Sequence, residues 1–189
     1  LPDSVDDNPE FAALARASSA AGLLDVDVSA RREGSVLAVT VTTANVRAAH
    51  PFPVGPFDLH EVWLEVLVQE PGSGAVLAHI GGIEGGLIDA SAPRLGARLL
   101  EEDGGPLREH RLDRLSRVVD VRQIWPGSPV VDELRLLLEG DAAGTLMVAA
   151  AWRFRRVTPA FAEFALGEGA VDGFEVLTLG SGSTAAAAE

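Results

Sequence analysis

Cysteine, lysine and tyrosine are all absent from this 189-residue sequence. The absence of cysteine excludes disulfides, thiolate metal sites, a cysteine nucleophile and thioether cofactor attachment within the chain. The chain has 15 basic residues, all of them arginines, and 28 acidic residues, which gives a net charge of −13. Such a chain repels nucleic acid and anionic membrane surfaces, and no basic stripe with interleaved aromatics offsets this. We therefore expect no nucleic-acid binding. No apolar run of about 18 residues is present, so we expect no membrane insertion either.

Apolar residues make up 47% of the chain and recur with a period of two over most of its length. This pattern predicts strands in eight segments: 23–30, 35–46, 61–70, 75–80, 99–112, 118–122, 130–139 and 145–157. The segment 99–112 is read as a strand, a turn and a second strand. Eight or nine short strands with turns every 8–12 residues favour an antiparallel β-sandwich over a parallel α/β sheet.

Two short helices are expected outside the strands. Asn8 and Pro9 are typical of a helix start, which predicts an N-terminal helical segment. Thr158 predicts the start of a second helix, with Phe161, Phe164 and Ala165 facing inward and Gly167 at its end. The predicted organisation has three parts: a helical segment (1–23), a β-sandwich (24–167) and a low-complexity tail or linker (168–189).

The polar residues form no catalytic motif. Zinc sites favour close ligand pairs, and His50, His60, His79 and His110 do not have that spacing. No paired acid and base and no activated nucleophile emerges, so the chain is predicted to be no enzyme and to hold no metal. Arg153 and Arg155 share one strand face and are expected to pair with carboxylates across the sheet.

His50 lies in the most rigid turn of the chain, HPFPVGP (50–56). Pro51 and Pro53 fix two φ angles and bias the residues before them towards extended geometry. An imidazole on such a support suits a ligand that points outward at a fixed place, and we expect its ring to be accessible at the sandwich rim. The alternative is a buried structural histidine whose ring bonds a backbone carbonyl.

The stretch around His50, AAHPFPVGPFDLHEVWLEV (48–66), resembles a motif of multihaem c-type cytochromes. In the β-sandwich domain that follows their haem-bearing region, G-H-x-[FL]-P-T-G precedes a D-L-x-x-x-W-L-E-V strand. Further likenesses follow in the same order, at 102–110, 120–138 and 152–167. Ala49 and Val54 depart from the motif, and the C-x-x-C-H haem sites are missing. The chain is expected to be either the sandwich part of a larger cytochrome or a relative that has lost its haems, and the missing initiator Met favours the first.

The resemblance implies an all-β fold, an Ig-like antiparallel β-sandwich of about eight or nine strands with a short helix near each end. It implies a non-catalytic accessory domain, periplasmic or extracellular, that packs against a multihaem cytochrome domain of the same parent chain or complex. His50 is then a candidate axial ligand or neighbour of a haem, with haem c in the parent or partner and none in this chain. The alternative is a free-standing extracellular module that binds a glycan or a protein.

Overall fold

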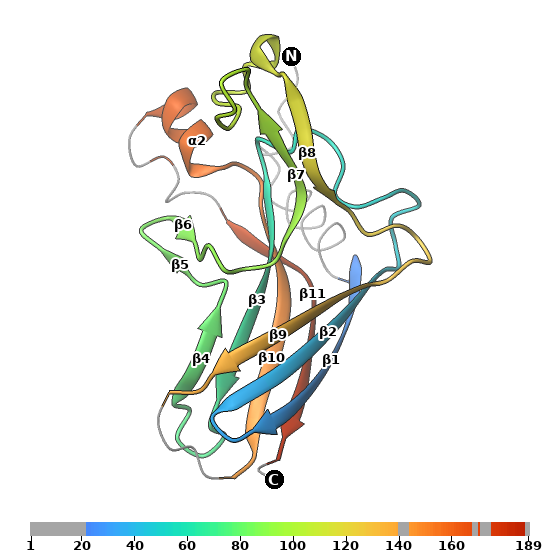
Figure 1. Cartoon of the computed structure of the whole chain (residues 1–189), viewed down its shortest axis with the longest axis vertical. Helices are drawn as coiled ribbons and strands as arrows, with labels where there is room; N and C mark the ends of the chain where they lie inside the picture. The colour runs from blue at the N-terminus through green and yellow to red at the C-terminus, as the bar shows by residue number, and fades with distance from the viewer. Residues whose placement is uncertain (1–21, 140–143, 168–169, 171–174, 188–189) are drawn as a thin grey trace, which may run out of the picture.

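The computed structural model describes residues 22–139, 144–167, 170 and 175–187, which form two main antiparallel sheets (Figure 1). The smaller sheet has the order β1-β2-β9, with β1 (Leu24–Glu33), β2 (Val36–Asn45) and β9 (Val130–Leu137). The larger sheet has the order β11-β10-β3-β7-β8, and β4 pairs with β3. Its strands are β3 (Glu61–Gln69), β4 (Val76–Ile80), β7 (Arg94–Leu100), β8 (Arg117–Arg122), β10 (Leu146–Arg155) and β11 (Val176–Ala186).

Three smaller elements complete the described part of the chain. A hairpin is made by β5 (Ile83–Glu84) and β6 (Leu87–Ile88), and the 3-10 turn η2 (Leu112–Arg114) precedes β8. The helix α2 (Pro159–Leu166) lies beside the β7–β8 hairpin at one end of the molecule (Figure 1). The predicted N-terminal helix lies outside the described residues.

The alternating pattern of the sequence places one face of each sheet in a common core. The β1–β2 hairpin pairs Leu24 with Asn45 and Glu33 with Val36, so every second residue of both strands points towards the larger sheet. Burial of these apolar faces is the main driving force of the fold. The predicted sandwich is therefore confirmed, as is the burial of the core residues Val39, Val41, Leu64, Val66, Val148 and Trp152, each at most 1% exposed.

The strand count and the tail differ from the prediction. Eleven strands occur within the described residues, because the two-residue strands β5 and β6 and the long strand β11 were not expected. The second half of 99–112 is not a strand, since Pro106 makes only an isolated bridge with Leu100. Half of the predicted linker (168–189) belongs to β11, which pairs with β10 from Leu146↔Ala186 to Arg155↔Val176.

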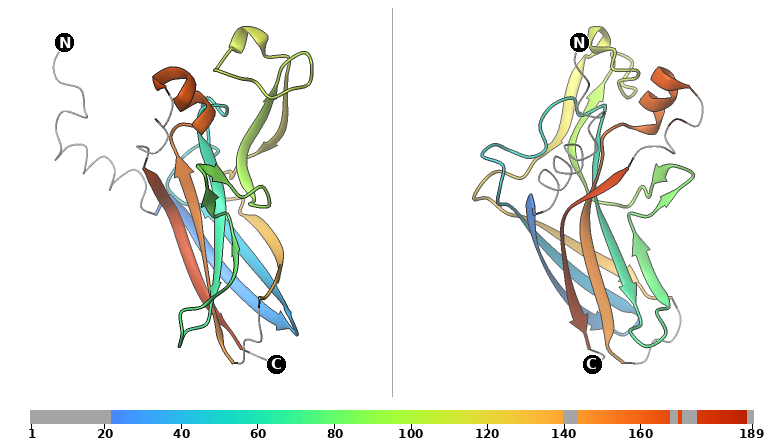
Figure 2. Two further views of the ribbon diagram at one scale, coloured as in Figure 1. Left: turned by 90° about the vertical axis from the view of Figure 1, so that its left-hand side faces the viewer. Right: turned by 180° about the vertical axis from the view of Figure 1, so that it is seen from behind.

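The glycines of the tail explain how a low-complexity segment can be a core strand. Gly180 and Gly182 lie directly against the backbone of β1, and β1 and β11 run side by side (Figure 2). A Cβ at Gly180 would overlap the carbonyl oxygen of Leu24, and one at Gly182 would overlap that of Val26. Because only glycine fits this close approach, the GSG sequence is a packing requirement of β11.

We expect Gly180→Ala and Gly182→Ala each to lower the free energy of unfolding by about 1–3 kcal/mol or more, because an added methyl must push two backbones apart. Urea denaturation measures the effect. Gly72→Ala is the matched control: Gly72 has open space around its Cα, so the change should stay within about 0.5 kcal/mol. Equal stability of all three variants would contradict the close approach.

The helix α2 begins as predicted but faces the body differently. The Thr158 hydroxyl accepts a hydrogen bond from the Phe161 amide. At the other end of the helix, the Gly167 amide donates to the carbonyl oxygen of Glu163. The expected inward orientation of Phe164 and Ala165 is wrong, since Phe164 is 57% exposed and Ala165 is exposed as well. Ala162 is the buried residue of this helix, because only a narrow face of so short a helix packs against the rest of the domain.

A hydrogen bond joins the two sheets at the centre of the core. Trp152 on β10 is fully buried, and its Nε1 donates to the Thr43 hydroxyl on β2 at 2.8 Å. The Arg122 guanidinium lies 5.9 Å from the Trp152 ring and donates to both carboxylate oxygens of Asp132 on β9, at 2.8 and 2.9 Å. These contacts fix the two sheets relative to one another.

Replacing the acceptor tests this connection. We expect Thr43→Val to cost about 1–3 kcal/mol of unfolding free energy, because it leaves the buried indole N–H without a partner. Thr42→Val, on the other face of the same strand, controls for the change in side-chain type. The proposed connection would be wrong if thermal or urea unfolding found the two variants equally stable.

Candidate functional site

The connection between β2 and β3 carries His50, and two sets of hydrogen bonds fix its course. The Asn45 amide donates to the carbonyl oxygens of His50 at 2.8 Å and of Ile124 at 3.2 Å, and its oxygen accepts from the Ala48 amide. Phe52 and Ile124 exchange two backbone hydrogen bonds, of 3.0 and 2.7 Å. The loop is therefore attached to the segment that precedes β9.

The His50 ring is exposed, as we expected from the proline turn. Its Nδ1 lies 2.9 Å from the carbonyl oxygen of Pro51. A carbonyl oxygen can only accept, so Nδ1 donates this hydrogen bond, and in the neutral form of the ring the lone pair is on Nε2. A neutral imidazole oriented in this way has the form that binds metal ions through Nε2.

Three exposed apolar side chains belong to the loop that carries His50 and to the segment bonded to it. Val46 is 57%, Val54 48% and Trp125 58% exposed. The segments are joined through the Asn45↔Pro126 bridge and through a hydrogen bond from the Gln123 side chain to the Pro53 carbonyl. We call Val46, His50, Val54 and Trp125 the rim surface; its two segments run side by side at the right of Figure 1.

Two of the other three histidines have a carboxylate partner. His79 Nε2 lies 2.9 Å from Glu65, and His110 Nδ1 lies 2.9 Å from Asp58. His60 Nε2 is buried and has no hydrogen-bond partner. Among the described residues, no three His, Asp or Glu side chains are grouped so as to hold a metal ion.

Sequence reasoning identified His50 but missed Trp125 and Asp58. Trp125 stands before a Pro-Gly turn, outside the alternating pattern, and that position was the available signal of its exposure. Asp58 had no local signal, because its partner His110 is 52 residues away in the sequence and meets it only in the fold.

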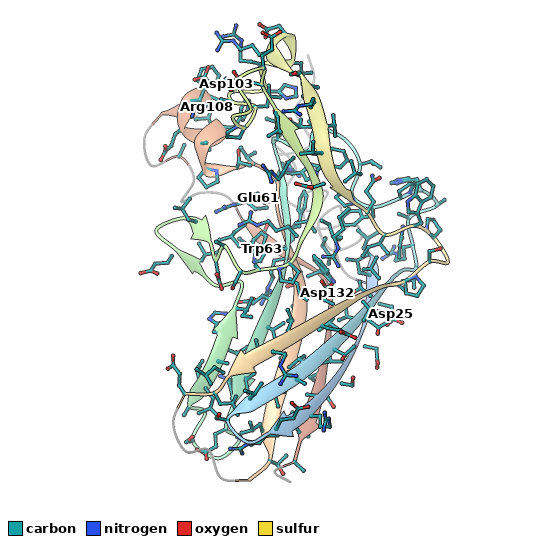
Figure 3. The ribbon with its side chains drawn as sticks, viewed as in Figure 1. Asp25, Glu61, Trp63, Asp103, Arg108 and Asp132 are labelled. Atoms are coloured by element: carbon teal, nitrogen blue, oxygen red, sulfur yellow. The ribbon has the colours of Figure 1, made fainter. Side chains whose placement is uncertain are left out.

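The predicted pairing of the strand arginines with carboxylates is confirmed. Arg153 Nε donates to Glu65 on β3 at 2.6 Å, and Arg155 Nε donates to Glu61 at 2.9 Å. Arg155 is only 3% exposed and donates to the Gly86 carbonyl as well. Glu61 and its neighbour Trp63 mark the course of β3 in Figure 3. These pairs stabilise the outer face of the larger sheet, and each arginine already has a carboxylate partner.

Glu65 has a pKa below its usual value. Burial of the carboxyl raises this pKa, but hydrogen bonds from His79 and Arg153 lower it and together prevail. The unfolded state, with a pKa near 4.5, therefore takes up the proton first as the pH falls. The Glu65 contribution to stability is present above that pH and is lost below it.

The stability difference between wild type and Glu65→Gln should accordingly be present at pH 7 and shrink as the pH falls below 4.5. Urea unfolding at a series of pH values measures it. Glu133→Gln, at an exposed position of β9, serves as the control and should show a smaller difference at neutral pH. A Glu65→Gln difference that is constant down to pH 3 would contradict the hydrogen-bonded carboxylate.

No known protein family and no curated protein matches the sequence. In fold, the chain is similar to a penta-haem cytochrome c552 from Thermochromatium tepidum, with a TM-score of 0.64 and 15% sequence identity. The match covers 86% of this chain and 39% of that chain, so this chain spans well under half the length of that cytochrome. At this identity the likeness concerns the fold, and it agrees with the resemblance seen in the sequence. No helix within the described ranges is long and apolar enough to cross a membrane.

Proposed function

We propose that this chain is a β-sandwich accessory domain of a multihaem electron-transfer protein and packs against a haem-bearing domain through the rim surface. The observation that carries the proposal is His50, an exposed imidazole on a rigid turn whose Nδ1 is hydrogen-bonded to the Pro51 carbonyl. The fold likeness to part of a penta-haem cytochrome and the motif around His50 support it. The role is non-catalytic, and a periplasmic or extracellular location belongs to the same proposal.

Haem c belongs, in this proposal, to another part of the parent chain or to a partner. The sequence has no cysteine, so thioether attachment cannot occur within it. The residues of the rim surface fit a haem neighbour, because exposed Val46, Val54 and Trp125 offer apolar contact around one histidine. Haem supplies the one-electron chemistry.

The task of this chain's own residues is to hold the imidazole in place. The hydrogen bond to the Pro51 carbonyl selects the tautomer with a free Nε2, and such outer contacts also raise the basicity of a ligating histidine. The Asn45 amide fixes the backbone on which the ring stands. His50 is therefore oriented before any iron is bound, at little cost in ordering entropy.

His50→Ala separates this proposal from a structural role. In the isolated chain we expect the unfolding free energy to change by less than about 0.5 kcal/mol, because the ring is exposed. In the intact haem-bearing protein, the variant should change the visible spectrum or the reduction potential of one haem. His79→Ala, which removes another exposed histidine, is the control and should leave the haems unchanged. Strong destabilisation of the isolated chain together with unchanged haem spectra would show that the loop is only structural.

The free-standing binding module is the second candidate, and Trp125 is the observation that favours it. An exposed indole can stack on a sugar ring or enter a partner protein. The exposed aromatic Phe164 lies on α2, however, so the described residues form no row of exposed aromatics on a sheet face. C-x-x-C-H repeats in the gene beside this segment would favour the accessory domain, and their absence would favour the binding module.

A further inference from the structure

A gap opens in the larger sheet where β7 separates from β3. The two strands pair only at Val62↔Leu95 and Trp63↔Arg94, and beyond this point the β7–β8 hairpin diverges. In Figure 3, Glu61 is labelled on β3 and Asp103 on the connection between β7 and β8. Two adjacent cavities of about 460 and 520 Å³ lie here, and Ala97 and Arg98 line both. Cavities of this size are typical of small-molecule sites.

Two buried polar atoms without partners belong to residues that line these cavities. In the described part of the chain, the only buried side-chain atoms without a partner are Arg32 Nη1, Asp58 Oδ1 and His60 Nε2. Asp58 lines the first cavity and His60 the second. A buried polar atom without a partner is costly, and a carboxylate oxygen can be satisfied only by a donor. Asp58 Oδ1 therefore lacks a hydrogen-bond donor.

Asp58 is held firmly although one of its oxygens is free. Its side chain is 6% exposed, and Oδ2 accepts from His110 Nδ1 at 2.9 Å. His110 and Glu109 both have left-handed backbone conformations, with φ of 55° and 54°. Strain of this kind persists where the surroundings impose it, and it is enriched at binding sites. The His110 ring also meets the edge of Phe161 on α2, at 6.5 Å between centroids.

The walls of the first cavity are mainly aliphatic. Besides Asp58 it is lined by Ala97, Leu99, Leu100, Pro106 and Leu107, with Gly104 and Arg98. The Arg98 guanidinium is exposed and pairs with Asp120 at 3.1 Å, so its charge is already matched. Burial lowers the pKa of His60 below 6.5, so this neighbouring imidazole is neutral at pH 7 and does not repel a cation.

We propose that the cavity beside Asp58 binds a primary alkylammonium group. The ammonium donates to Asp58 Oδ1, and a short aliphatic stem lies against Leu99, Pro106 and Leu107. A charge-assisted hydrogen bond in a low-dielectric cavity supplies the affinity, and the apolar walls select the stem. The site is independent of haem and of the rim surface.

The test is a titration of the full chain with n-butylammonium chloride, followed by NMR of backbone amides and histidine ring nitrogens. We expect saturable shifts at His110, Ala97 and Leu107, with a dissociation constant on the order of 1 mM, as befits so small a ligand. Tetramethylammonium, which has the charge but no N–H donor, and n-butanol, which has the stem but no charge, should give no saturation.

Two variants locate the site. Asp58→Asn should weaken binding by about tenfold or more, because the charged acceptor is lost. Asp25→Asn, which removes an exposed carboxylate of β1 that lines neither cavity, is the matched control and should leave the affinity unchanged. Ala97→Leu should block binding by filling the space while keeping Asp58, and it decides the matter if Asp58→Asn does not fold.

Three results would overturn the proposal. The first is the absence of saturable shifts in the wild type, which would mean that water alone satisfies Asp58 Oδ1. The second is equal affinity of wild type and Ala97→Leu, or of wild type and a folded Asp58→Asn. The third is equally tight binding of tetramethylammonium or n-butanol, which would show that hydrogen bonding to Asp58 is not the basis of recognition.

Discussion

The hydrogen bond between Trp152 and Thr43 is the contact on which the arrangement of this domain depends. It joins the two sheets where no water can compete, and the Arg122 guanidinium beside the same indole continues the connection to Asp132 on β9. Arg122 ends β8, so its position also sets the start of the segment that leads to Ile124. Ile124 in turn is hydrogen-bonded to Phe52, so the inter-sheet contact is connected to the loop that carries His50.

One connection, 46–60, carries both candidate sites. Its first half holds His50 on the rim surface, and its second half holds Asp58 beside the gap between β3 and β7. The two sites differ in chemistry. His50 is an exposed imidazole held by the carbonyl of the next residue, whereas Asp58 is a buried carboxylate held by His110, which is far away in the sequence. Because each has its own hydrogen bonds, either can be altered without removing the support of the other.

The sequence predicted much of the fold because alternation is a local property. A half-buried strand shows its period of two in any ten residues, so β1, β2, β3 and β10 were found, as was the Thr158 cap of α2. His50 was found for a similar reason, since its prolines are its immediate neighbours. β11 was missed because its apolar alternation is diluted by Gly180 and Gly182, whose small size is explained only by β1 on the facing sheet.

Composition and short-range pattern determined by themselves that this chain is an acidic β-sandwich without thioether-bound haem and that His50 stands on a rigid turn. Only the tertiary structure decided that Val176–Ala186 of the tail form a strand and that exposed Trp125 lies on the segment bonded to the His50 loop. It alone also decided that Asp58 is buried against His110. These features arise from contacts between residues far apart in the chain, and a contact of that kind leaves no periodic signature in either of the segments that make it.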